Sequence, residues 1–266
     1  MITELKYSNT NTYLISGSKG SLLFDTGWAG TFPAFCMALG DKGLKLQDID
    51  YLMISHFHPD HYGIAQEIAD KGVTLVVVDI QKDYIHSYDK VFFKDKHTDF
   101  KPIDDERIKL ISIDDSREFL SGLGISGEVF HTPGHSDDCI SLWIDDEKAL
   151  FVGDLNPLYE LEMHKGTQID DSWKRLLALK PKKVYYGHAK TAELQRGLFR
   201  KEAAATDIYS LVKQIMKLVD KGCAAEQIMD KTGADMTFIT DVTRMYVTHQ
   251  NVSVQGILDR IEIKGK

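Results

Sequence analysis

The chain has 266 residues, of which 43% are hydrophobic and 27% are charged. This composition is that of a globular protein and excludes an intrinsically disordered chain. It contains 32 Lys and Arg residues against 40 Asp and Glu residues, and the net charge of −8 argues against a general nucleic-acid binder. Three cysteines, Cys36, Cys139 and Cys223, lie far apart and form neither a disulfide framework nor a Cys-x-x-Cys metal motif. Such cysteine usage is typical of a reducing compartment.

The first residues lack the basic and apolar regions of a secretion signal. No stretch approaches the roughly 18 apolar residues that a membrane span needs. We therefore expect a cytoplasmic protein without a membrane partner. The length favours one large domain, or one domain with an appendage.

The predicted elements begin with a hairpin. Its two apolar strands, 13–15 and 22–24, are separated by a polar segment with two glycines. The pattern then predicts a helix over 32–39, a strand over 51–54, a helix over 64–69 and a strand over 73–78. Residues 84–107 mix aromatic and charged side chains without a clear period, and we expect a long loop or a helical excursion over the surface.

Short apolar runs predict further strands at 109–113, 127–130, 139–144, 149–152 and 183–186. Between the last two strands, Asp170 and Asp171 are expected to cap a helix. That helix carries Trp173, Leu176 and Leu177 at helical spacing on its apolar face. These strands and helices predict an α+β fold.

Beyond residue 195 the pattern becomes helical throughout. Apolar residues repeat at helical spacing from 208 to 219 and end at Gly222, which suits the residue that follows a helix. Shorter helices are predicted at 224–230, 238–248 and 254–261. We therefore predict a strand-rich domain over 1–195 and a helical C-terminal extension over 196–266.

The chemistry concentrates in one short motif. His56, His58, Asp60 and His61 follow directly after a predicted buried strand. Imidazole nitrogens and carboxylate oxygens are the natural ligands of a borderline cation such as zinc. The alternative, a polar surface turn with a chance run of histidines, is disfavoured because only 10 of the 266 residues are histidine.

Three further polar residues, His135, Asp154 and His188, each follow a glycine beyond a predicted strand. Taken alone, each would be an ordinary turn residue. Since all of them follow strand ends, their loops can converge on one edge of a sheet, and convergence is what a metal site needs. We expect the remaining histidines to be surface or strand-end residues.

In the order of these motifs, the sequence resembles the metallo-β-lactamase superfamily, with a glyoxalase II-like ligand set. Asp25, the His-x-His-x-Asp-His motif, His135, Asp154 and His188 match the family's motifs in order. The resemblance implies a four-layer αβ/βα sandwich with its site at one edge between two sheets. The segment 237–266 is similar, more weakly, to the winged-helix-like extension of some members, including an endoribonuclease branch.

Carried over residue by residue, the resemblance implies two divalent metal ions. One would be held by His56, His58 and His135. The other would be held by Asp60, His61 and His188, with Asp154 bridging the two and Asp25 orienting a ligand histidine. Two cations about 3.5 to 4 Å apart can share a water and convert it to a hydroxide nucleophile near neutral pH. Asp60 would also accept a proton from that water.

Departures from the family pattern argue against two activities, antibiotic hydrolysis and redox chemistry at iron. The best-known antibiotic-hydrolysing subclass carries Cys where Asp154 stands, and flavodiiron reductases replace the histidine at His58 by Glu. We therefore expect a hydrolytic site, with zinc as the metal and iron or manganese as alternatives. Tyr159 could hydrogen-bond a developing oxyanion, although a partly buried aromatic residue is an equally good interpretation.

The sequence thus predicts a hydrolase of a small ester, thioester or lactone. Two alternatives stay open. One is a phosphodiesterase or ribonuclease on the same scaffold, which would make nucleic acid a partner. The other is a metal-binding regulatory member with little activity. The substrate and the oligomeric state are not indicated.

Overall fold

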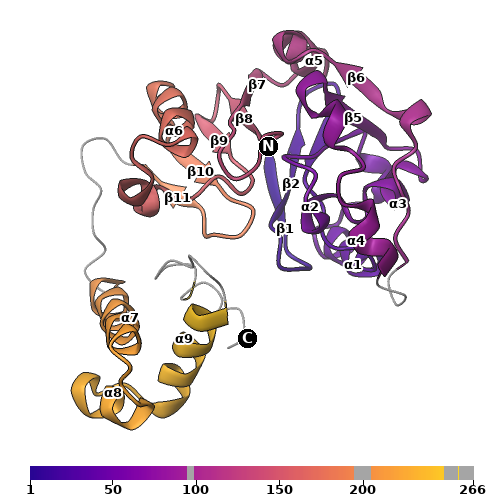
Figure 1. Ribbon diagram of the computed structural model, residues 1–266. Helices are drawn as coiled ribbons and strands as arrows, with labels where there is room; N and C mark the ends of the chain where they lie inside the picture. The colour runs from indigo at the N-terminus through magenta and orange to yellow at the C-terminus, as the bar shows by residue number, and fades with distance from the viewer. Residues whose placement is uncertain (95–98, 195–204, 249–256, 258–266) are drawn as a thin grey trace. The chain divides into compact units, whose positions relative to one another are not determined.

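The computed structural model describes residues 1–94, 99–194, 205–248 and 257. The chain divides into two compact units, Met1–Leu194 and Gln195–Lys266. The first contains two β-sheets with helices, and the second is helical (Figure 1). Among the helices described, none has both the length and the apolar character that crossing a membrane requires.

The first sheet has six strands that lie side by side in chain order. They are β1 (Ile2–Leu5), β2 (Thr12–Ser16), β3 (Ser21–Phe24), β4 (Tyr51–Met53), β5 (Thr74–Val78) and β6 (Lys109–Ile111). β2 and β3 form the predicted antiparallel hairpin, whereas β3 to β6 pair in parallel. The parallel strands therefore all end at the same edge of the sheet.

The second sheet has five strands in the order β11-β10-β9-β8-β7. They are β7 (Gly127–His131), β8 (Ile140–Ile144), β9 (Ala149–Phe151), β10 (Lys183–Tyr185) and β11 (Ala192–Glu193). β9 and β10 are parallel, and β8 runs antiparallel to both β7 and β9. As a result, the loops that follow β7, β9 and β10 leave this sheet at one edge.

Three hydrophobic clusters create the layers of this unit. The middle cluster joins the inner faces of the sheets, with Phe24 and Met53 from the first and Leu142 and Phe151 from the second. The outer face of the first sheet is covered by α1 (Phe32–Asp41), α3 (Ala65–Ala69) and α4 (Asp89–Lys94). The outer face of the second is covered by α6 (Gln168–Ala178), whose Trp173 is fully buried. These layers are the expected four-layer αβ/βα sandwich (Figure 1).

The apolar patterns explain most of these elements. β5 is apolar from Leu75 to Val78 because it lies between β4 and β6 with side chains buried on both faces. The predicted 64–69 helix corresponds to α3, and a separate short helix that was not predicted, α2 (Pro59–Tyr62), precedes it. In the excursion at 84–107 the structure has α4 and a 3-10 turn, Asp105–Arg107.

The sequence prediction missed several short elements, among them β1, β11 and α5 (Ser116–Gly122). The two strands lie at sheet edges, where only one neighbour constrains the pattern. The prediction that Asp170 and Asp171 cap α6 is wrong, because the helix begins at Gln168 and both lie in its first turn. There the Asp170 carboxylate accepts a hydrogen bond from the backbone N–H of Gly166.

Buried polar side chains connect the two sheets close to the motif loop. The Gln81 amide donates to the backbone oxygens of Ile54, Ser55 and Asp138 over 3.0 to 3.3 Å. Asp138 in turn accepts a hydrogen bond from the backbone N–H of Phe57 at 2.7 Å. Since buried polar groups are costly unless paired, these bonds fix the loop of one sheet against the other.

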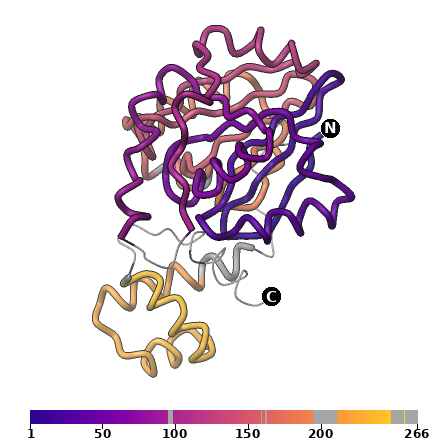
Figure 2. Tube along the Cα trace, turned by 90° about the vertical axis from the view of Figure 1, so that its right-hand side faces the viewer, coloured from indigo at the N-terminus to yellow at the C-terminus, as the bar shows by residue number. Residues whose placement is uncertain are grey.

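The second unit is built from α7 (Ala205–Asp220), α8 (Ala225–Thr232) and α9 (Met236–Thr248). These helices enclose a hydrophobic core that includes Val212, Ile215, Ile228, Ile239 and Val242. The course of the three helices can be followed in Figure 1 and Figure 2. Gly222 follows α7 with a φ of +72°, as its predicted place after the helix requires. The predicted helix over 254–261 and His249 lie outside the described residues, except for Ile257, which joins this core.

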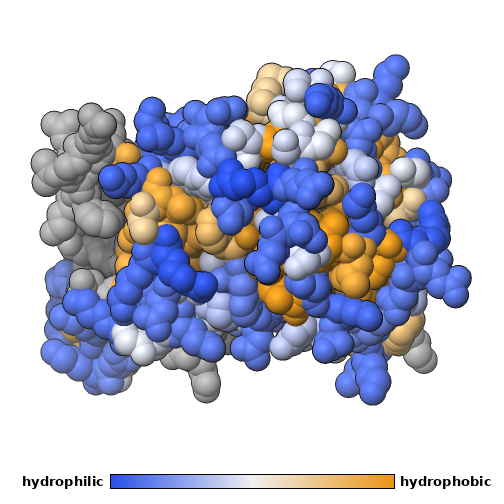
Figure 3. Space-filling view, turned by 90° about the horizontal axis from the view of Figure 1, so that it is seen from above, coloured by the Kyte–Doolittle hydropathy of each residue, from blue (hydrophilic) through white to orange (hydrophobic). Residues whose placement is uncertain are grey.

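Seen from above, the surface is mostly hydrophilic and carries separate apolar patches (Figure 3). Large apolar side chains that are exposed on the first unit include Trp28, Phe93, Leu110 and Met163. Phe92, beside one of them in the chain, is instead buried in the core.

Candidate metal centre

The residues singled out in the sequence lie at the carboxyl ends of strands. The His-x-His-x-Asp-His motif follows β4 in the first sheet. His135, Asp154 and His188 follow β7, β9 and β10 in the second sheet. The structure brings all of these residues together at one edge of the sandwich.

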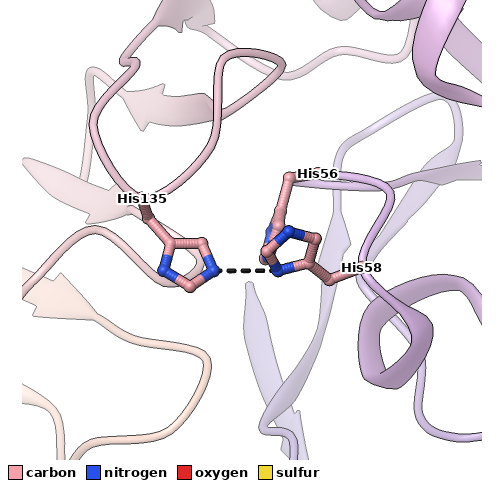
Figure 4. A group of neighbouring side chains, drawn as sticks. All are labelled: His56, His58 and His135. Carbon is pink, nitrogen blue, oxygen red and sulfur yellow. Dashed lines mark hydrogen bonds between the residues drawn. The ribbon is translucent and has the colours of Figure 1, made fainter. Parts of the chain in front are cut away.

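One group of ligand atoms comes from His56, His58 and His135. In each group of this centre the ligand atoms lie within 4.8 Å of one another. His56 and His58 extend from the first sheet and His135 faces them from the second (Figure 4). The Nδ1 atom of His58 lies 3.0 Å from Nε2 of His135. Three imidazoles thus surround one point.

A second group comes from Asp60, His61 and His188. The Nε2 atom of His188 lies 2.9 Å from a carboxylate oxygen of Asp60. Asp154 lies between the two groups. Its Oδ1 is 3.2 Å from Nε2 of His61, and its Oδ2 is 3.4 Å from Nε2 of His188 and 3.6 Å from Nε2 of His135. One carboxylate therefore faces members of both groups.

Three buried atoms at this point make no hydrogen bond of regular geometry among the described residues. They are Nε2 of His56, Nε2 of His61 and Oδ1 of Asp154, of which the last two lie 3.2 Å from each other as an ion pair. A buried polar atom without a partner costs about 1 to 3 kcal/mol. All three belong to atom types that bind divalent cations. The residues present therefore fit a metal centre.

The ring nitrogens on the far side of these imidazoles do have partners. Nδ1 of His56 lies 3.0 Å from the Ser55 hydroxyl, and Nδ1 of His188 lies 2.7 Å from the backbone oxygen of Asn9. Nδ1 of His61 lies 3.0 Å from Asp25, whose other oxygen accepts from the Ser55 backbone N–H. Such partners orient a ligand ring and fix which nitrogen carries the proton. Asp25 therefore lies against a histidine ring of the motif, as the resemblance implies. Its backbone has a left-handed φ of +65°.

The group of three histidines favours uncharged imidazoles. Burial lowers the pKa of His56 well below its ordinary value, and the neighbouring His61 acts in the same direction. Burial also lowers the pKa values of His58 and His135. A neutral imidazole has a lone pair for a cation, so these rings are in the protonation state that binding requires.

In the second group the pKa values of the histidines are raised. Burial alone would lower the pKa of His188, but Asp154 and Asp60 outweigh it and raise that pKa to about 10. Asp154 and Asp25 similarly raise the pKa of His61 well above its ordinary value, against the effect of burial. His61 and His188 hold the pKa of Asp154 well below its ordinary value, although burial opposes this. Without a cation, protons on the two imidazoles balance the carboxylates.

The polar run Asn9–Asn11 is a part of the site that the sequence analysis missed. The Thr10 hydroxyl donates to the backbone oxygen of Asp60 at 2.7 Å. The Asn11 amide donates to the backbone oxygens of Tyr186 and Ala189, both at 3.0 Å, on either side of His188. This run therefore holds two ligand-bearing loops together. Its only sequence signal is a polar cluster before a strand, which is too common to be diagnostic.

Tyr159, the other residue predicted to be catalytic, lies in a 3-10 segment, Leu158–His164. Its side chain is outside the part of the chain that the structure describes. The neighbouring Asn156 donates to Glu160, and Trp173 donates to the backbone oxygen of Asn156. The segment is thus attached to α6 beneath it.

Comparison with known proteins decides the family. The family profile of the metallo-β-lactamase superfamily matches residues 6–188, a span that contains every strand-end residue described above. The chain belongs to the metallo-β-lactamase superfamily. The members of this superfamily are typically hydrolases that bind divalent metals.

The chain is similar to curated proteins from different organisms. A beta-lactamase-like protein 2 homolog from Drosophila melanogaster is 29% identical over 72% of this chain and 62% of its own length. An atrochrysone carboxyl ACP thioesterase from Emericella nidulans is 27% identical over 54% of this chain and 39% of its own length. The chain thus matches less than two thirds of either relative.

The fold has close counterparts among solved structures. TTHA1623, crystallised in a di-iron-bound form, has a TM-score of 0.54 and 19% identity, over 73% of this chain and 94% of that one. This metallo-β-lactamase sandwich is therefore shared even where few residues are identical.

A glycine offers a test of the centre in this superfamily member. A Cβ atom at Gly187 would lie 2.5 Å from Oδ1 of Asp154 and 2.8 Å from Cε1 of His61. We expect Gly187→Ala to displace both side chains and to weaken zinc binding at least about tenfold, measured by competition with a chromophoric chelator. Gly40→Ala is the matched control, because nothing lies within 4 Å of its added Cβ. Equal zinc affinities of Gly187→Ala and Gly40→Ala would contradict the prediction that a Cβ atom at Gly187 displaces Asp154.

Proton release provides a second test. The pKa of His188 is raised to about 10, so its ring is protonated at pH 7, and the pKa of His61 is raised well above its ordinary value, whereas a metal ligand must be unprotonated. Metal loading at pH 7 should therefore release at least one proton, and the affinity should rise as the pH increases toward 10. Calorimetric titration in buffers of different ionisation enthalpy measures this number. Binding heats that do not depend on the buffer would contradict the prediction that metal binding displaces protons from these histidines.

Proposed function

We propose that the protein is a zinc-dependent hydrolase of a small thioester, ester or lactone, with two metal ions at one centre. The observation that carries the proposal is the pair of ligand groups linked by Asp154, whose buried atoms on His56, His61 and Asp154 make no regular hydrogen bond among the described residues. Nitrogen and oxygen ligands suit zinc, and iron or manganese would also be accepted. The di-iron form of the neighbour TTHA1623 supports two ions.

The residues have separate proposed roles. His56, His58 and His135 would hold one ion, Asp60, His61 and His188 the other, and Asp154 would bridge them. When bound, such ions lower the pKa of water and polarise the oxygen of a carbonyl group.

Asp60 is the proposed proton acceptor. The hydrogen bond and the charge of His188 lower its pKa against the effect of burial, so its carboxylate is ionised near neutral pH. An ionised carboxylate at this position can hold a proton taken from the attacking water and pass it to the leaving group. Tyr159 is proposed to donate a hydrogen bond to the oxyanion that develops on the substrate.

Among carbonyl substrates, we favour a thioester. The relatives named as acyl carrier protein thioesterases support this class. We further propose that 1–195 is the catalytic domain and that 196–266 is a helical extension to it. The cysteines Cys36, Cys139 and Cys223 are unpaired, which supports a cytoplasmic location.

The test compares three substrates on zinc- and manganese-loaded protein. They are a thioester of N-acetylcysteamine, a lactone and bis(p-nitrophenyl) phosphate. We expect hydrolysis of the thioester or the lactone, with loss of activity on chelation. Cleavage of the phosphodiester alone would replace the proposal by a phosphodiesterase. A metal-loaded protein inactive on all three would indicate a regulatory member.

Two carboxylate variants test the roles. Asp154→Ala should lower both the activity and the metal affinity. The loss should exceed the roughly 10- to 100-fold that is typical when a residue hydrogen-bonded to a metal ligand is removed. Asp60→Asn should lower the rate strongly, and full metal content with a full rate would refute both roles of Asp60. Asp137→Asn is the matched control, because this carboxylate is exposed and lies two residues from His135. It should leave metal binding and rate unchanged.

A further inference from the structure

His58 presents a different nitrogen to the centre from the other histidines of its motif. Its Nδ1 faces His135, whereas in His56 and His61 the buried atom that makes no regular hydrogen bond among the described residues is Nε2. The outward nitrogen of His58 is therefore Nε2. It lies 3.1 Å from the hydroxyl oxygen of Tyr88, and the two rings meet edge to face with centroids 4.9 Å apart.

The identity of the outward nitrogen matters for the protonation of the ring. A neutral imidazole carries one proton, on either Nδ1 or Nε2. If Nδ1 is to offer a lone pair to the centre, the proton must be on Nε2, and that N–H then needs an acceptor. The Tyr88 hydroxyl oxygen lies at hydrogen-bond distance and can accept it.

Tyr88 is itself held against the motif. The next residue, Asp89, accepts a hydrogen bond from the hydroxyl of Tyr62, which directly follows His61. The other oxygen of Asp89 lies 2.8 Å from Nδ1 of His86, whose Nε2 lies 2.9 Å from Asp105. These contacts attach the start of α4 to the motif and fix the backbone that carries Tyr88.

We propose that Tyr88 is a positioning residue that accepts a hydrogen bond from Nε2–H of His58 and so keeps the Nδ1 lone pair directed into the centre. Tyr88 contacts the outward nitrogen of His58 and acts on the centre through that ring. The effect on metal affinity rests on the proposed metal-dependent function, whereas the effect on the His58 proton does not.

The first measurement uses the full chain without metal. Two-bond ¹H–¹⁵N correlation spectra of protein labelled with ¹⁵N-histidine distinguish the two neutral forms of the ring, and His58→Gln identifies the His58 signals. We expect His58 to carry its proton on Nε2 in the unmodified protein. In Tyr88→Phe the signals should shift toward the form with the proton on Nδ1.

The second measurement is zinc affinity, by competition with a chelator. Tyr88→Phe should weaken binding about tenfold. Tyr84→Phe is the control, because it removes a hydroxyl from a partly buried tyrosine of the same segment that packs on the core. It should change neither the affinity nor the His58 signals.

Two results would overturn the inference. One is a His58 that carries its proton on Nδ1 in the unmodified protein. The other is a Tyr88→Phe protein whose His58 signals and zinc affinity equal those of Tyr84→Phe. A chain that binds no zinc would refute the proposed function instead, and the His58 signals would still decide the role of Tyr88.

Discussion

The loss of hydration at buried ligand atoms is the constraint on which this structure depends. Nε2 of His56 is buried without a hydrogen-bond partner among the described residues, and Nε2 of His61 and Oδ1 of Asp154 are buried against each other as an ion pair, so the loss of water from these atoms costs free energy. The fold tolerates this cost because the outer nitrogens of the same rings and the loops that carry them are hydrogen-bonded. Asp25, Ser55, Asn9 and the backbone hold the outer nitrogens and the loops. The molecule thus supplies an ordered shell whose inner atoms are left for a cation.

The two ligand groups balance their charge in different ways when no cation is bound. The three-histidine group is neutral without a cation, because burial lowers the pKa of its rings. The other group holds Asp60 and Asp154 and compensates their charge by protons on His61 and His188. A cation is therefore in competition with protons mainly in the second group. In a dinuclear centre, this difference would make the second ion the more sensitive one to pH.

Much of the site could be predicted from the sequence, because its signals are local. Four potential ligand residues within six positions, and single polar residues after glycine at strand ends, can be recognised without knowledge of the fold. The supporting residues could not be predicted in this way. Gln81 and Asn11 act by reaching backbone oxygens that are distant in the chain, and Tyr88 lies in a stretch without any period. Edge strands such as β1 and β11 escaped prediction since a single neighbour leaves little pattern in their residues.

The central claim is that this edge of the sandwich holds two cations on histidine and carboxylate ligands. X-ray absorption at the zinc edge of the loaded protein tests it most directly. The account predicts two zinc ions per chain, a zinc shell of nitrogen and oxygen only, and a second zinc at about 3.5 to 4 Å. A single ion, or a sulfur atom in the shell, would contradict it.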